Sequence, residues 1–317
     1  MPLHSDVHID RPLSNFAVAY PVGTLIASQA VPFVDVNNKT DSYMTYQKKD
    51  SFTLPTSMIR GPKDYAVEVD WATGTGSYAC IDQAVREFLP DAIVGNADPG
   101  VDPRRRTVNM LVNLILLKYE YTISSLITTA GNYGGSYKQT LSGGDQWSAF
   151  ATSDPLGNVE TARGQCFMEP NVCVMGVEVW RKLKQHPQIL DRISGGSTNA
   201  SPAMVTPQLV AELFEVDKLL IGTAKYNTSN YAQTESYSYI WGKDVVFAYL
   251  NEQPGLDDPS AFKTFRWRQL TTDVGYQVRT YREEAKGGGG EWIEVETAYD
   301  EEAVCTDNAS IVDTVIA

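Results

Sequence analysis

The clearest repeat of apolar positions lies in residues 102–130 and predicts one long helix. Asp102 suits the N-cap, Pro103 suits the first turn, and Gly131 supplies a C-terminal stop. Such a helix would run roughly 40 Å, which is long for a globular domain and suits an elongated molecule. The apolar side chains recur close to the helical period of 3.6 residues, at Val108, Leu111, Val112, Ile115, Tyr119, Ile123 and Leu126.

Alternation of apolar and polar positions predicts a long β-hairpin over residues 42–71. Residues 42–47 alternate moderately and residues 64–71 alternate more clearly, with proline and glycine between them. A two-stranded ribbon is marginal alone in water, so its aromatic side chains should require a partner surface. An ordinary hairpin packed on its own domain is the alternative. The aromatic residues concerned are Tyr43, Tyr46, Tyr65 and Trp71.

The remaining segments predict a mixed α+β chain. Residues 1–40 are broken by proline and glycine and predict an extended arm without a core of its own. The glycine-rich residues 131–146 predict a flexible connector, and residues 156–165 predict a helix. Further strands are expected at 171–175, 218–224, 244–250, 264–269, 276–283 and 292–299, with helices at 177–185 and 208–214.

Composition narrows the class of protein. The chain has 317 residues, of which 43% are hydrophobic, so it can bury a sizeable core. No apolar run reaches the ~18 residues of a membrane span, and the first residues do not resemble a secretory signal. The net charge of −13 argues against a protein that grips nucleic acid electrostatically, but not against one that encloses it.

The chain is poorly supplied with residues for a catalytic or metal site based on histidine. Its four cysteines form no C-x-x-C pair, and only three histidines are present, so we expect free thiols and no zinc site. The motifs G-x-S-x-G, H-E-x-x-H and G-x-G-x-x-G are absent. Residues 283–302 hold eight acids against one lysine and predict a solvated acidic face. No catalytic, cofactor-binding or metal site is predicted, and the chain is not expected to be an enzyme.

Several segments taken together resemble the major capsid proteins of tailed bacteriophages with the Hong Kong 97-like fold. The similarity extends over roughly residues 40–317, and it lies in the order and spacing of many short segments. The segments are Asp154–Arg163, Glu169–Gly176, His186–Ile193, Ala211–Asn227, Trp241–Lys243, Phe262–Trp267 and Tyr299–Glu301.

The resemblance implies a division of the chain into capsid regions. Residues 1–40 would form an N-terminal arm, and residues 41–75 the extended loop that reaches over a neighbouring subunit. Residues 76–170 would form a peripheral domain whose spine helix is 102–130. The axial domain would span 171–260, and 261–317 would supply the return strands of the peripheral domain and the C-terminus.

The function implied by the resemblance is assembly as hexamers and pentamers into an icosahedral head that encloses double-stranded DNA without sequence-specific binding. Expected partners are other copies of the chain, a separate scaffolding protein, a portal and a decoration protein, with no membrane and no cofactor. The expected location is the virion, after assembly in the host bacterial cytoplasm. Contacts between subunits are predicted at Tyr43, Tyr46, Lys48, Arg60, Lys63, Tyr65, Trp71, Arg104, Arg105 and Arg106.

Three alternatives stay open from the sequence. An encapsulin-like compartment shares the shell fold and packs a cargo enzyme. An uncharacterised α/β hydrolase is a member of a different class, but the chain has no nucleophile motif. A decoration or tail protein would be shorter and less helical.

Overall fold

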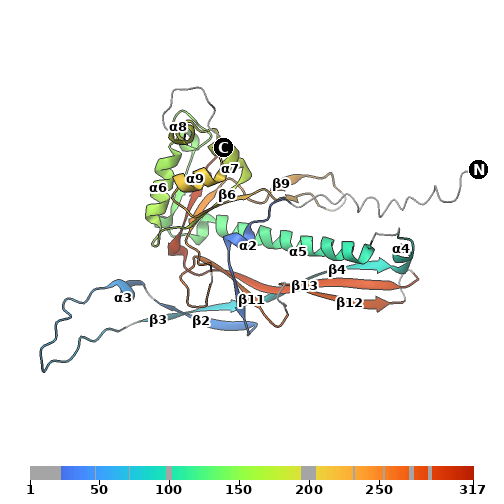
Figure 1. Cartoon of the computed structure of the whole chain (residues 1–317), viewed down its shortest axis with the longest axis horizontal. Helices are drawn as coiled ribbons and strands as arrows, with labels where there is room; N and C mark the ends of the chain where they lie inside the picture. The colour runs from blue at the N-terminus through green and yellow to red at the C-terminus, as the bar shows by residue number, and fades with distance from the viewer. Residues whose placement is uncertain are drawn as a thin grey trace, which may run out of the picture.

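The computed structural model describes residues 23–46, 48–70, 72–97, 102–193, 205–230, 233–252, 254–270, 275–284 and 288–317. Figure 1 shows an upper lobe of helices around a sheet, a long helix lying along a second sheet, and a loop that projects to one side. Predicted segments outside these ranges, including most of the arm at residues 1–22 and the aromatic residue Trp71, lie outside the described residues.

The second sheet is built around one long strand, β13 (Gly290–Ala303). This strand pairs antiparallel with β4 (Ile81–Pro90), β12 (Gln277–Glu283) and β11 (Phe262–Trp267), and β11 pairs in parallel with β1 (Phe33–Val36). The strands expected near residues 264, 276 and 292 are therefore confirmed, although β13 is longer than predicted.

The long helix is confirmed as α5 (Pro103–Thr128) and lies along β13 and β4. The Asp102 carboxylate accepts hydrogen bonds from the Arg104 and Arg105 amides, as expected of an N-cap. Gly131 does not end the helix. Near the end of α5, the carbonyls of Leu126 and Ile127 accept hydrogen bonds from the side chains of Asn132 and Tyr133.

The apolar stripe of α5 packs onto the sheet. Leu111 and Ile115 share a buried cluster with Leu89, Ile293 and Val295. By length and composition, α5 is the one helix within the described ranges that could cross a membrane. Packing along this sheet accounts for the buried apolar stripe of the helix.

The sheet of the upper lobe has the order β5 (Lys138–Thr140), β14 (Ala309–Asp313), β10 (Val245–Ala248), β6 (Val172–Gly176) and β7 (Lys218–Gly222). The strands predicted from residues 171, 218 and 244 are confirmed. The predicted flexible connector is wrong in part, because β5 lies within it and pairs in parallel with β14.

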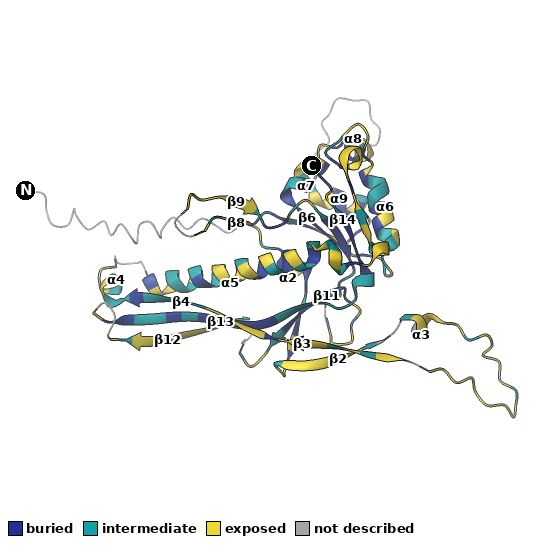
Figure 2. Ribbon diagram, turned by 180° about the vertical axis from the view of Figure 1, so that it is seen from behind, coloured by how far each residue is buried: buried dark blue, intermediate teal, exposed yellow. Residues whose placement is uncertain are grey.

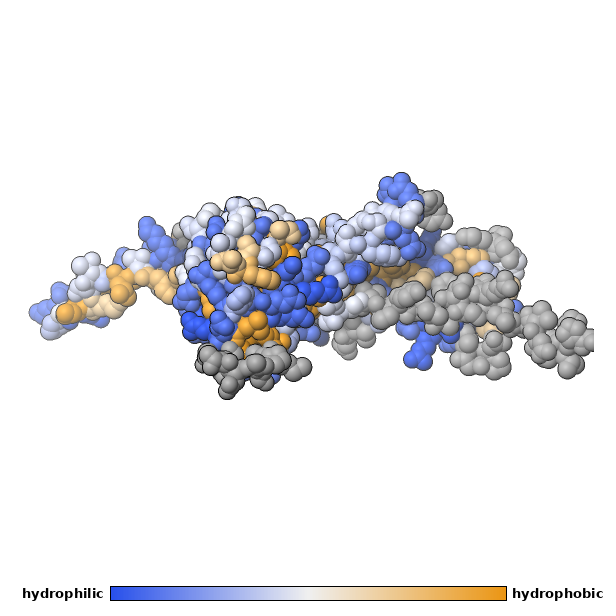
Figure 3. All heavy atoms as spheres, turned by 90° about the horizontal axis from the view of Figure 1, so that it is seen from above, coloured by the Kyte–Doolittle hydropathy of each residue, from blue (hydrophilic) through white to orange (hydrophobic). Residues whose placement is uncertain are grey.

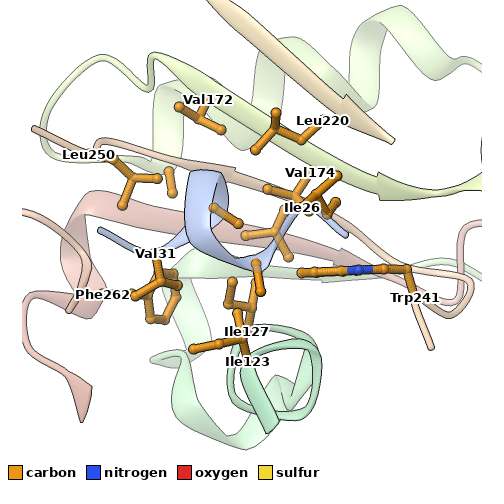
Figure 4. Packing of buried hydrophobic residues seen from close by; sticks show 14 of the residues in the cluster. Ile26, Val31, Ile123, Ile127, Val172, Val174, Leu220, Trp241, Leu250 and Phe262 are labelled. Carbon is orange, nitrogen blue, oxygen red and sulfur yellow. The ribbon is translucent and has the colours of Figure 1, made fainter. Parts of the chain in front are cut away.

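Both faces of this sheet are buried, which explains its nearly continuous apolar strands. Val172 and Val174 of β6 point into a core shared with α5, shown in Figure 4. Cys173 and Met175 point to the other face, beneath the lobe helices. Those helices are α6 (Pro155–Gln165), α7 (Val177–Leu183), α8 (Pro187–Ile193) and α9 (Pro207–Leu213).

The end of the predicted arm is part of the body. Residues 23–40 contain α2 (Ala27–Ala30) and β1, and the buried residues Ile26, Val31 and Val34 pack into two cores of their own chain. The expectation of a coreless arm is therefore wrong for this segment, because its short apolar runs find an interior between α5 and β11.

The predicted hairpin is correct in its first strand and wrong in its second. β2 (Thr40–Tyr46) pairs with β3 (Thr73–Ala79), whereas residues 64–70 form no strand. Between the two strands lie α3 (Lys48–Phe52) and an irregular stretch. The remaining short elements are α4 (Asp91–Gly95), β8 (Lys225–Asn227), β9 (Tyr237–Tyr239) and 3₁₀ turns at Ala130–Asn132, Gly135–Tyr137, Gly143–Asp145 and Thr306–Asn308.

Candidate assembly surfaces

The ribbon of β2 and β3 is anchored to the body at its root. Tyr43 and Tyr78 both pack against Phe265 of β11, with ring centroids 5.4 and 4.7 Å away. Tyr43 also lies across Gly76, its partner in the ribbon, where an added Cβ would come within 2.3 Å of the ring. Glycine at position 76 therefore allows the tyrosine to reach the body.

A second set of contacts holds α3 near the body. Lys48 forms an ion pair with Asp307, and its ammonium lies 4.7 Å from the centroid of the Phe167 ring. Phe52 meets the same ring edge-on at a centroid distance of 5.0 Å. These contacts fix the direction in which the chain leaves the body.

Beyond α3 the chain projects away from the body, and we call residues 53–70 the loop tip. Figure 2 shows the tip as almost entirely exposed, and Figure 3 shows apolar atoms along it. The side chains of Ile59 and Tyr65 are 92% and 98% exposed. Contiguous exposed apolar side chains of this kind mark surfaces that bind another protein. The other large apolar side chains exposed here are Leu54, Met58, Val67 and Val69.

The sequence-predicted contact residues of the loop fall into two groups. Tyr43 and Lys48 lie at the root and contact their own chain, whereas Arg60, Lys63 and Tyr65 lie exposed at the tip. The side chain of Tyr46 and the whole of Trp71 are outside the described residues. A role between subunits stays a prediction for all seven.

Apart from Tyr65, the apolar residues of the tip were not among the predicted contacts. The sequence did carry a signal for them: apolar residues without helical or strand period, in a segment broken by proline and glycine. Met58 and Ile59 follow this description, whereas Val67 and Val69 lie in the alternating segment that was assigned to a strand.

The three arginines at the start of α5 do not share one environment. Arg104 forms an ion pair with Glu291 of β13, which is the carboxylate partner that a cation at a helix N-terminus calls for. Arg105 is exposed, and Arg106 is half-buried. Arg104 therefore helps to hold α5 against the sheet, and its role between subunits stays a prediction, as do those of Arg105 and Arg106.

A buried carboxylate joins three parts of the chain and was not found from the sequence. Glu120 of α5 is fully buried and accepts hydrogen bonds from the amides of Ile26 and Ala27, at 2.8–3.0 Å. It also accepts one from the indole nitrogen of Trp241, at 2.5 Å. A buried acid is stabilised only when its oxygens are satisfied, so this residue ties α2 and the upper lobe to α5.

The prediction of a solvated acidic face at residues 283–302 is wrong in part. Glu296 is buried and ion-paired with Arg279, and Glu291 is paired with Arg104. Burial raises the pKa of Glu301 to about 7, and its Oε1 atom has no hydrogen-bond partner among the described residues. These acids lie on β13 at the centre of a sheet, so this part of the predicted face is covered.

The described residues bring together no cluster of three metal-binding side chains. His186 is buried against Ser153, with 3.0 Å between its Nε2 and the hydroxyl oxygen, and burial lowers its pKa. The four cysteines are free thiols, as expected, and burial raises the pKa of Cys80 to about 11.

Two curated relatives share most of their length with this chain. A protein of Pseudomonas phage JBD67 named major capsid protein is 31% identical over 241 residues, 76% of this chain and 77% of the relative. Another of that name, from Burkholderia phage BcepMu, is 25% identical over 252 residues and 78% of each chain. No protein-family model matches the chain.

Solved structures share its fold. A phage-related protein of Bordetella bronchiseptica RB50 aligns with a TM-score of 0.69 and 21% identity, covering 96% of this chain and 97% of its own. The capsid structure of the cyanophage P-SCSP1u aligns at 0.60 and 11% identity, over 93% and 90% of the two chains. The SrpI encapsulin of Synechococcus elongatus PCC 7942 aligns at 0.50 and 11%, over 96% and 95%.

Proposed function

The chain belongs to the family of phage major capsid proteins, and from this premise we propose that its copies form rings of six and of five that close into an icosahedral head around double-stranded DNA. The fold expected from the sequence resemblance, the Hong Kong 97-like capsid fold, is confirmed by the likeness to solved phage capsids. The place of the chain is the capsid of a virion.

The alternatives from the sequence are weaker. The encapsulin likeness is a likeness of fold alone at 11% identity, whereas the relatives with substantial sequence identity are named as phage capsid proteins. Capsid proteins are structural, so the names of the relatives support a chain without catalytic activity and give no support to a hydrolase.

The observation that carries the proposal is the apolar loop tip. Burial of a large apolar side chain against a partner stabilises by about 1.5–3 kcal/mol, and six such side chains between Leu54 and Val69 lack cover in their own subunit. Since each copy in a closed shell makes this contact with a neighbour, individually modest contacts add to a stable particle.

We further propose that the regions of the chain have the roles that the resemblance implied. The loop from β2 to β3 would lie over a neighbouring copy, and α5 would be the spine helix of a peripheral domain. The upper lobe would stand near the axis of each ring. Its sheet takes strands β5 and β14 from outside residues 171–260, so an axial unit would draw on three stretches of the chain.

Partners other than the chain itself belong to the same proposal. A scaffolding protein, a portal and a decoration protein would act during and after assembly in the host bacterial cytoplasm. The net charge of −13 supports a container that encloses DNA without adhering to it along its whole inner surface.

The test is electron microscopy of the expressed chain, alone and with its phage's scaffolding protein. The wild-type chain should form closed shells. A Met58→Ser/Ile59→Ser variant should stay as folded, unassembled subunits. The matched control is Ile81→Ser, which removes a 65% exposed isoleucine from β4 and should leave shell yield unchanged. Equal yields from the tip variant and the control would contradict the role of the tip.

A further inference from the structure

One edge of the upper lobe carries two cations that converge on a tyrosine. The ammonium of Lys225 on β8 lies 4.6 Å from the centroid of the Tyr239 ring, and the guanidinium of Arg181 on α7 lies 5.7 Å from it. Both cations are exposed. In the part of the chain that the structure describes, neither forms a salt bridge.

The groups around this edge leave it positively charged. The hydrogen bond from Arg181 and the two positive charges together lower the pKa of the Tyr239 hydroxyl. The carboxylate found on the same hairpin, Glu235, accepts a hydrogen bond from the hydroxyl of Tyr237, at 2.9 Å. We call Arg181, Lys225 and Tyr239 the cationic edge.

The other edge of the lobe carries a hollow with acidic walls. It lies between α6, α8 and α9 and has a volume of about 780 Å³. Carboxylates outnumber guanidinium groups in its lining by five to two, and we call it the acidic groove. The charged lining residues are Asp154, Glu160, Asp191, Glu212 and Glu215, with Arg163 and Arg192.

One arginine of the groove already has three carboxylates of its own chain around it. Arg163 is within 2.8–3.6 Å of oxygens of Glu160, Glu169 and Glu215, so three negative charges share one positive charge. Glu160 and Glu215 are still largely exposed. Glu160, Glu212 and Glu215 therefore leave exposed negative charge in the groove.

Elements that carry the two charged surfaces lie on different sides of the lobe. Figure 1 places α6 at one side of the lobe and α7 with the β8–β9 hairpin at the other, and the reverse view in Figure 2 agrees. The loop that ends in the loop tip leaves the body on the α6 side. A neighbour that received the tip would therefore lie on the same side of the molecule as α6.

We propose that the cationic edge of one copy docks on the acidic groove of the next copy in the ring. The inference rests on the proposed function and names the charged contact that orders the copies around the axis. Two different surfaces of one chain that fit each other head to tail generate a closed ring when the rotation between copies closes. Opposite charge on the two surfaces fixes that direction and disfavours head-to-head pairs.

The experiment reverses the charge of each surface separately. One variant, Arg181→Glu/Lys225→Glu, makes both surfaces of the lobe acidic, and another, Glu160→Lys/Glu212→Lys, makes both basic. Each variant alone should lose shells by about tenfold or more, because like charges meet at every contact. The quadruple variant exchanges the two signs and should form complete shells again.

Mixing the two double variants gives a sharper result. When copies of the two variants alternate around a ring, every contact again joins surfaces of opposite charge. Such alternation is possible only in a ring with an even number of copies. The mixture should therefore form rings of six and open sheets or tubes built from them, but no rings of five and no closed icosahedral shells.

The control is Lys182→Glu/Lys184→Glu, which makes the same charge change at the exposed Lys182 of α7 and at its exposed C-cap Lys184, and should assemble within about twofold of wild type. Circular dichroism and melting of the unassembled subunits check that every variant folds. Shells at wild-type yield from the Arg181/Lys225 variant would overturn this inference while leaving the capsid function intact. Particles with normal rings but altered DNA content would assign the cationic edge to nucleic acid instead. Absence of shells from the wild-type chain would instead count against the proposed function.

Discussion

The loop tip and the upper lobe contain the same kinds of apolar side chain in opposite surroundings. In the lobe, Val246 and Phe247 are neighbours on β10 that point to opposite faces of the sheet, and both are buried. In the tip, Met58 and Ile59 are also neighbours, and both are exposed. The lobe strand has a layer of protein on each face, whereas the tip has none.

The difference shows which apolar side chains are buried within the subunit and which can be buried only by contact with another copy. A strand buried on both faces stabilises the subunit that contains it. An apolar segment without a second layer contributes little to the subunit, and its burial energy becomes available only on contact with a partner. The comparison therefore predicts that mutations in the lobe act on folding and mutations in the tip act on assembly.

The largest effect on the isolated subunit is expected from Phe247→Ala in the lobe. The side chain is fully buried beside Phe214, so its truncation leaves a cavity and should lower the free energy of unfolding by about 3–5 kcal/mol. Urea denaturation of the unassembled subunit measures the change. Phe247→Leu serves as the control and should cost less. A loss below about 1 kcal/mol for the alanine variant would remove the contrast with the tip.

A smaller loss is expected from Glu120→Gln at the junction of α2, α5 and the lobe. The amide keeps the size of the side chain but replaces one accepting oxygen by a donor that faces backbone and indole N–H groups. The free energy of unfolding should fall by about 2–3 kcal/mol. The matched change Glu68→Gln in the exposed tip should have no measurable effect on the same denaturation curve.

Glu301→Gln should stabilise the subunit at high pH. Burial raises the pKa of Glu301 to about 7 in the folded state, so the folded protein binds the proton more tightly than the unfolded chain. Stability therefore falls as the pH rises from about 4.5 to about 7, and stays reduced above that range. At pH 8 the neutral glutamine should gain about 1–2 kcal/mol, with allowance for the solvent that reaches this half-buried group.

Melting temperatures of wild type and Glu301→Gln measured between pH 4 and pH 8 check this sign. The two proteins should melt at similar temperatures at pH 4 and diverge as the pH rises. Glu302→Gln is the neighbouring control, because burial raises the pKa of Glu302 to a lesser degree. A difference in melting temperature that grows toward low pH would contradict a raised pKa for Glu301.

The smallest effect on the subunit is expected from Tyr65→Ala in the tip. The side chain is 98% exposed, so the free energy of unfolding should change by less than about 0.5 kcal/mol. Shell yield, measured by electron microscopy and sedimentation, should nevertheless fall. Trp71→Ala is expected to act in the same direction. Normal shell yield together with a large loss of subunit stability would reverse the comparison between tip and lobe.

Local patterns in the sequence were sufficient to predict the helices and strands whose caps and apolar periods lie within the element itself. The capped, periodic segment that became α5 and the apolar run that became β6 are confirmed, because a helix or a doubly buried strand imposes its own period of apolar side chains. The family resemblance was likewise carried by the order of such segments.

The pairing of strands depended on contacts with other parts of the chain, which local patterns did not predict. Residues 64–71 alternate like a strand, but β2 pairs with residues 73–79, where Gly76 admits the ring of Tyr43. Pairing register depends on both strands and on the surface beneath them, which alternation in one strand does not encode.

The sequence by itself determined the long helix, the apolar strands of the lobe, the absence of recognised catalytic motifs and the likeness to phage capsid proteins. Only the tertiary structure decided that Glu120 is buried at a junction, that Glu301 lies covered on β13, and that charges of opposite sign occupy opposite edges of the lobe. Burial and electrostatic environment are properties of three-dimensional neighbours, and those neighbours come from distant segments: Glu120 contacts Ile26, 94 residues away, and Trp241, 121 residues away.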